Sequence, residues 1–132
     1  MNIVSAVFIE SFAMRQAPGP ATRIDITGVY FSVAAPNHPP VSIDPHLMAL
    51  IYCPADENGS GNFEVIFRKG PTEESEQLAR NVSPFSVEPG KFTYRLVRGE
   101  IELHELGQIF AHCRINQGPW TLVPLTLLPP IA

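Results

Sequence analysis

The chain has 132 residues, a formal net charge of −4 and an apolar content of 45%. This length suits one domain, residues 1–132, with enough apolar side chains to build a core. The acidic balance and the lack of a basic stripe exclude nucleic acid as a partner, and no apolar stretch approaches the roughly 20 residues that a membrane-spanning helix needs.

The 14 prolines favour turns and short strands over long helices, because proline lacks an N–H and clashes with the preceding helical turn. The first ten residues carry no lysine or arginine before a short apolar run, so we expect no cleaved signal peptide. Cys53 and Cys113 are spaced like the bridge of antibody domains, but Trp120 follows both instead of lying between them. We therefore expect two buried free thiols and a cytoplasmic protein.

The first predicted strand is the apolar run over residues 3–12, and a turn rich in proline and glycine follows at 16–21. In the next predicted strand, residues 22–33, the apolar positions change from even to odd numbers after Gly28. A one-residue change of phase at a glycine predicts a β-bulge.

Residues 36–45 contain four prolines and are expected to form an extended connection. Residues 47–53 are apolar on both parities, as in a central strand, and a polar loop at 56–62 connects them to a strand over 63–68. The acidic segment 71–80 is expected to hold at most one helical turn.

Alternating apolar residues predict strands at 92–96 and 108–115, and a turn at 116–119 leads into a last strand over 120–128. The chain therefore divides into about seven or eight short strands with little or no helix. This pattern predicts an all-β fold, an antiparallel β-sandwich, and disfavours a βαβ fold.

Four features carry a family resemblance. They are the strand Gly28–Phe31 before a proline-rich link, the apolar strand Leu47–Tyr52, the Asn62–Val65 start after a polar hairpin, and the strand Gly107–Arg114 followed by a turn and Trp120. In this order they resemble a family of small, uncharacterised bacterial proteins with an immunoglobulin-like β-sandwich. The resemblance implies a Greek-key fold and a bacterial, non-secreted setting, and it brings no catalytic or binding residues to this chain.

The loop over residues 56–62 matches the first half of a calcium loop, with candidate oxygen ligands on Asp56, Asn58 and Ser60. The second half does not match, because Phe67 stands where a bidentate glutamate is needed. A hairpin tip rich in Asp, Asn and Gly is explained without a metal. We therefore expect no metal and no cofactor, and the loop is the one candidate for an ion.

Catalytic motifs are not complete. His104 begins a zinc-peptidase pattern, but Gln108 stands in place of the second histidine. His112 and Cys113 are neighbours on a predicted strand, so their side chains should point to opposite faces and cannot form a dyad. We therefore expect that the protein is not an enzyme.

The expected function is a non-catalytic binding or structural module that acts through protein–protein contact. In the strand over 47–53 the odd-numbered residues suffice for the core, which leaves Met48, Leu50 and Tyr52 as the candidate interface. A two-fold homodimer is the expected way to cover them. The internal alternative is that residues 36–45 or 125–131 fold over this face.

A second possible function is a small-ligand or carbohydrate-binding sandwich, which would use exposed aromatics such as Trp120, Tyr30 or Tyr52 beside polar loop groups. An enzyme ranks third. Lys91, Arg95 and Arg98 form a small cationic patch, for which an ordinary polar sheet face is sufficient.

Overall fold

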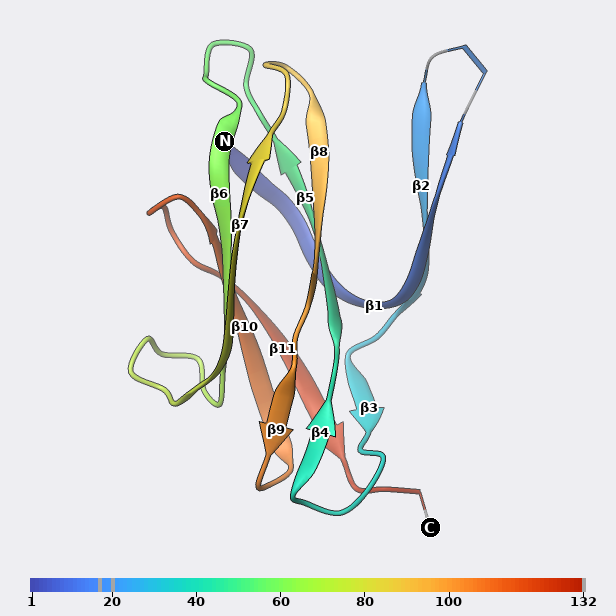
Figure 1. Cartoon of the computed structure of the whole chain (residues 1–132), viewed down its shortest axis with the longest axis vertical. Coiled ribbons are helices and arrows are strands. Elements are labelled where there is room, and N and C mark those ends of the chain that lie inside the picture. The colour runs from blue at the N-terminus through green and yellow to red at the C-terminus, as the bar shows by residue number, and fades with distance from the viewer. Residues whose placement is uncertain (17, 20, 132) are drawn as a thin grey trace.

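The computed structural model describes residues 1–16, 18–19 and 21–131. Among these residues the fold is all-β with no helix, as predicted (Figure 1). The strands are β1 (Asn2–Gln16), β2 (Thr22–Val29), β3 (Ser32–Ala34), β4 (Val41–Ile43), β5 (His46–Tyr52), β6 (Ser60–Arg68), β7 (Gln77–Ser86), β8 (Phe92–Arg98), β9 (Ile101–Leu103), β10 (Gly107–Ile115) and β11 (Thr121–Leu128).

The described strands form three sheets, with the orders β2-β1-β5-β8, β3-β11-β10-β6-β7 and β4-β9. All pairings within them are antiparallel except that of β3 with β11, which is parallel. The expected count of seven or eight strands is too low. Three of the additional strands have only three residues each, and β7 begins inside the acidic segment that was expected to hold a helical turn.

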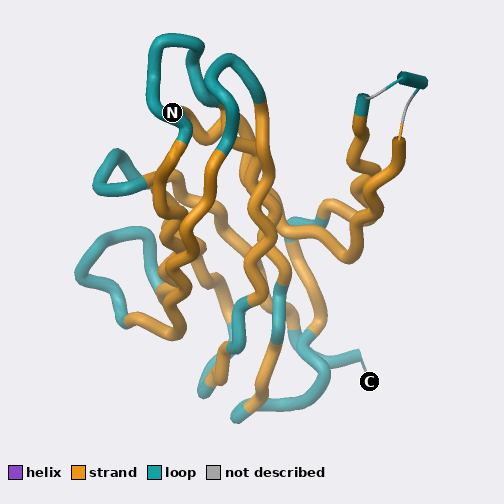
Figure 2. The backbone as a smooth tube through the Cα atoms, turned by 45° about the horizontal axis from the view of Figure 1, so that its top comes forward, coloured by secondary structure: helices purple, strands orange, loops and turns teal. Residues whose placement is uncertain are grey.

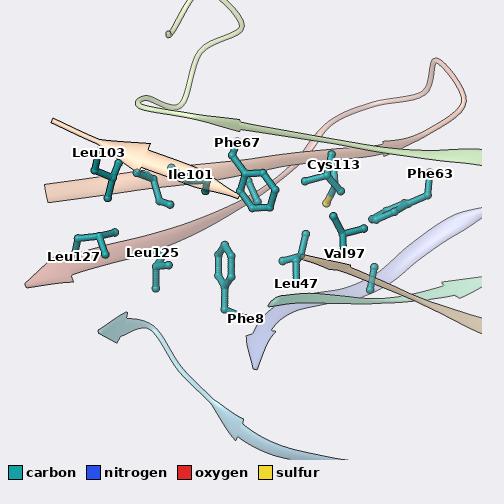
Figure 3. Close-up of a cluster of buried hydrophobic side chains, with 14 of the residues drawn as sticks. Phe8, Leu47, Phe63, Phe67, Val97, Ile101, Leu103, Cys113, Leu125 and Leu127 are labelled. Atoms are coloured by element: carbon teal, nitrogen blue, oxygen red, sulfur yellow. The ribbon is translucent and has the colours of Figure 1, made fainter. Parts of the chain in front are cut away.

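The two larger sheets share one core (Figure 3). Leu47, Ala49 and Ile51 of β5 are fully buried, and they face Phe63 and Phe67 of β6 in the same cluster. These positions alternate along their strands because successive side chains of a strand point to opposite faces. In β10 the alternation read from the sequence identifies the core face correctly, since Ile109, Ala111 and Cys113 are buried. In β8 it does not, because the alternating apolar residues Phe92 and Tyr94 lie on the outer face of the sheet.

The prediction of a continuous strand over residues 22–33 with a bulge at Gly28 is wrong. β2 ends at Val29, and the chain then crosses to the other sheet, where Ser32 begins β3. Gly28 adopts a left-handed φ of 68°, yet the register between β1 and β2 is the same on both sides of it. The change in apolar phase accompanies this change of sheet, and Phe31 beyond it is exposed.

β1 pairs with a different strand of the same sheet in each of its halves. Its first half, Asn2–Ile9, pairs with β5, and its second half, Ile9–Gln16, pairs with β2. The second half and β2 form a hairpin that stands out from the sandwich (Figures 1 and 2). We call this hairpin, Glu10–Gln16 with Thr22–Val29, the arm.

Candidate functional site

The arm is an amphipathic two-stranded ribbon. Phe12 and Met14 of β1 lie directly opposite Ile26 and Ile24 of β2, so these four apolar side chains share one face. The other face is polar, and there Arg15 Nε lies 2.6 Å from Asp25 Oδ2. Such a ribbon is stable in water only if its apolar face is covered.

The apolar face of the arm contacts the outer face of β8, which belongs to the same sheet. The ring of Phe12 lies 5.8 Å from the ring of Tyr94 in β8. The Tyr94 hydroxyl donates a hydrogen bond of 3.2 Å to the sulfur of Met14. The arm therefore lies beside the face that carries the interface candidates predicted from the sequence.

The three interface candidates differ in how far they are buried. Met48 is only 1% exposed, whereas Leu50 and Tyr52 are half-buried. The two segments considered as an internal cover lie elsewhere, since Val41 and Leu125 belong to the core cluster. The arm lies beside this face through its contacts with Tyr94, and it leaves part of the face open.

A groove of about 570 Å³ remains between the arm and the sheet, and we call it the trough. Its lining residues are Met14, Arg23, Ile24, Leu50, Phe92, Thr93 and Tyr94. Two of its apolar side chains are exposed, Phe92 by 61% and Met14 by 51%. Tyr52 supports Phe92, with 5.2 Å between their ring centres. The trough is thus an apolar surface that is open to a partner.

A polar cluster occupies the outer face of the other large sheet. Glu64 is only 7% exposed, and its two carboxylate oxygens accept hydrogen bonds of 2.8 Å from Arg80 Nε and 2.7 Å from Arg114 Nε. Burial alone would raise the pKa of Glu64, but the hydrogen bonds from Arg114 and Arg80 outweigh it and hold this pKa below its ordinary value. This carboxylate is therefore kept ionised in place.

Trp120 belongs to the same cluster. The Arg114 guanidinium stacks 4.0 Å from the centre of the Trp120 ring, and the indole N–H donates a hydrogen bond to Glu73. His112 meets the ring edge-on at 6.1 Å. Trp120 is half-buried and occupied by these contacts. Its ring is thus engaged by Arg114 and His112 within the polar cluster.

Tyr30, another aromatic candidate for a ligand site, is half-buried and lines a hollow of about 190 Å³ near Asp44. Burial, then Asp44 and Glu10, raise the pKa of Tyr30 above its ordinary value. The phenol is therefore neutral at physiological pH. The third aromatic candidate, Tyr52, packs against Phe92 at the trough.

His112 and Cys113 diverge as predicted. A ring nitrogen of His112 lies 2.9 Å from the carbonyl oxygen of Gly70, on the polar side of the sheet. Cys113 faces the core, where burial raises its pKa to about 12. Cys53 and Cys113 are both free and buried. A thiol so protonated is a poor nucleophile.

The calcium-like loop is organised by its own hydrogen bonds. Asn58 Oδ1 accepts the backbone N–H of Ser60 at 3.0 Å, as in an ordinary Asx turn. Glu57 Oε2 lies 2.7 Å from the N-terminal ammonium group. Across the described part of the chain, no three His, Cys, Asp or Glu side chains are grouped so that they could hold a metal ion.

The arm was not predicted from the sequence, although its signal is present there. Ile24 and Ile26 alternate with Arg23 and Asp25, which indicates one apolar face on that strand. The pattern does not indicate, however, that this apolar face contacts β8 of the same sheet. Among the residues that the structure describes, none forms a helix that could cross a membrane. Comparison of the sequence with protein-family models and with curated protein sequences gives no match.

Proposed function

We propose that this protein is a non-catalytic binding module that holds an apolar segment of another protein in the trough. The observation that carries the proposal is the exposure of Phe92 and Met14 at the trough, beside half-buried Leu50. Contiguous exposed apolar surface usually marks an interaction site, and aromatic and methionine side chains are enriched in protein interfaces.

The shape of the trough favours a narrow partner over a second copy of the chain. A standard interface buries about 800 Å² on each partner, but Met48 is already buried within the chain and Leu50 is half-buried. The surface left open is a groove beside a projecting hairpin. A homodimer through this face is the rival form of the proposal, and its test is the oligomeric state.

A small apolar ligand is the second candidate function. The trough volume of about 570 Å³ lies within the range of about 300–1,000 Å³ that is typical of ligand pockets. The Tyr94 hydroxyl would supply a polar group at its wall. A protein segment accounts better for the high exposure of Phe92, because a small-ligand pocket encloses most of the surface of its ligand and this groove is open.

We also propose an immunoglobulin-like Greek-key arrangement for the fold. In support, the neighbours β1, β5 and β8 match strands A, B and E of that fold, and β6, β10 and β11 match C, F and G. Cys53 follows the B-like strand and Cys113 lies in the F-like strand. Free thiols at these positions support a reducing compartment such as the cytoplasm.

The test is selection of linear peptides from a random display library on the immobilised protein. Selected peptides should lose binding to Phe92→Glu and retain it with Phe31→Glu. Phe31 is a matched control, because its ring is 77% exposed but lies outside the trough. Peptides that bind both variants equally, or a library that yields no binder, would overturn the proposal. Light scattering that gives a dimer for the wild type and a monomer for Phe92→Glu would instead establish the second copy as the occupant.

A further inference from the structure

β8 is an edge strand of its sheet, because it pairs only with β5 among the described strands. Two hydrogen bonds fix which of its backbone groups are used. Cys53 N–H donates to Lys91 C=O at 3.0 Å, and Gly99 N–H donates to Pro45 C=O at 2.8 Å. Antiparallel pairs alternate between bonded and non-bonded positions. The odd-numbered residues of β8 therefore bond to β5, and the even-numbered residues turn their N–H and C=O groups to the open edge.

The same even-numbered residues have their side chains on the trough side. Tyr94 lies opposite Leu50, and Phe92 lies opposite Tyr52. A strand that pairs with the open edge of β8 would therefore place alternate side chains on the trough side, towards Met14 and Ile24 of the arm. In Figure 1 the arm and β8 extend in the same direction, with no other strand drawn between their upper parts.

The other edges of the sheets are less suited to strand addition. β7 contains Pro84, which has no N–H to donate. β3, β4 and β9 have three residues each. The extended backbone of β2 is interrupted at Gly28, which adopts a left-handed conformation. β8 has seven residues and no proline.

The basic residues on and next to β8 favour an acidic partner. Lys91 and Arg98 are neutralised by Glu88 and Asp44, at 2.6 and 3.2 Å. Arg95 lies between them and takes part in none of the ion pairs found in the described part of the chain. A second copy of β8 would bring basic residues against basic residues, which is a common protection against edge-to-edge pairing. An acidic residue opposite Arg95 would be attracted.

We propose that β8 binds an extended segment of a partner protein by antiparallel strand addition. The segment is apolar at alternate positions, which face the trough, and acidic at the position opposite Arg95. This inference rests on the proposed function and adds to it the conformation and the chemistry of the partner.

The test uses a synthetic peptide, acetyl-Thr-Val-Glu-Ile-Thr-Val-Thr-amide. In the antiparallel register its Ile lies opposite Tyr94 and its Glu lies opposite Arg95. N-methylation of the Ile removes an N–H that would bond to β8 and should weaken binding roughly tenfold or more. N-methylation of the Glu alters an N–H that points away from β8 and should leave the affinity unchanged. Isothermal titration calorimetry on the full chain measures all three peptides.

A charge exchange supplies an independent test. The peptide with Lys in place of Glu should bind the wild type more weakly than the parent peptide does. The Arg95→Glu variant, once its circular dichroism matches that of the wild type, should reverse this preference. If that variant does not fold, the pair of N-methylated peptides still decides the question on the wild-type protein.

Each contrary result has its own meaning. If both N-methylated peptides bind as tightly as the parent, strand addition is overturned while the trough remains a binding site. If the parent peptide does not bind although peptides from the library do, the acidic extended partner is overturned and the proposed function stands. A dimer that the parent peptide dissociates would identify a second copy as the occupant and overturn the choice of a different protein.

Discussion

Phe12 of the arm and Tyr94 of β8 are in ring contact, at 5.8 Å between their centres, although they lie far apart in the sequence. The Tyr94 hydroxyl also reaches the sulfur of Met14, the next residue on the same face of the arm. One tyrosine thus meets two side chains of the arm. This contact fixes the width of the trough, because the arm and β8 are its two walls.

Replacing Phe12 with alanine should loosen the arm while the core of the sandwich remains folded. The half-buried ring contributes apolar burial and an aromatic contact, so we expect a loss of about 1–2 kcal/mol in arm docking. Limited trypsin digestion measures this directly, since Arg15 and Arg23 lie on the arm and should be cut faster. Ser11→Ala changes the polar face of the arm and is the matched control. Equal cleavage of the two variants would contradict the contact described here.

Glu64→Gln should destabilise the protein and should make its stability less sensitive to acid pH. The substitution leaves Arg80 and Arg114 without their common carboxylate, and we expect a loss of about 2 kcal/mol because Arg80 is itself half-exposed. The folded-state pKa of Glu64 lies below its ordinary value of 4.5. Its contribution is therefore present above that pH and is lost as the pH falls through the folded-state value.

Urea unfolding at several pH values checks this prediction for Glu64. As the pH is lowered below about 5, the wild type should lose stability more steeply than Glu64→Gln does. Glu88→Gln removes an exposed ion pair with Lys91 and should have little effect at neutral pH. Parallel pH profiles for the wild type and Glu64→Gln would count against the role assigned to this carboxylate.

Cys113 should be unreactive in the native protein. Burial raises its pKa to about 12, so iodoacetamide at pH 8 meets a protonated and inaccessible thiol. In denaturant without reductant, intact-mass analysis should show that both cysteines are alkylated. A protein that needs reductant before it can be alkylated would contain a disulfide.

Burial of Cys113 also affects stability at alkaline pH. The folded state keeps the Cys113 thiol protonated, so its contribution to stability is present below the ordinary pKa of 9.0 and is lost as the pH rises above it.

Millimolar calcium should not raise the melting temperature. In the loop over residues 56–62 the side-chain oxygen of Asn58 already bonds to Ser60, which leaves it less available to a cation. A site with a dissociation constant of about 10 μM would add about 2.7 kcal/mol at a hundredfold excess of calcium. A clear rise in melting temperature, lost in Asp56→Asn, would establish this loop as a calcium site.

The core of the fold was readable from the sequence, because alternation is local. In β10, residues such as Ile109 and Ala111 carry their own evidence of burial at every second position. β7 was missed because its charged neighbours and Pro84 resemble a loop. The crossing after Gly28 was missed because a change of apolar phase is the same whether a strand bulges or changes sheet.

The candidate site was only partly readable, for a different reason. Leu50 and Tyr52 do line or border an open apolar surface, and the apolar character of both parities of β5 pointed to it. The trough depends on the arm, which contacts β8 through residues distant in the sequence. Periodicity within one strand carries no information about which hairpin folds over it.

Because β1 runs through both the arm and the sandwich, binding in the trough should be detectable at residues outside it. The 15 residues of β1 form one continuous strand, whose first half is bonded to β5 and whose second half carries the arm. A partner that holds the arm in place must restrain the whole strand, including the amide protons shared between β1 and β5. Slower deuterium uptake by Ala6 and Ala49, which pair outside the trough, would therefore report its occupancy without a label on either binding surface.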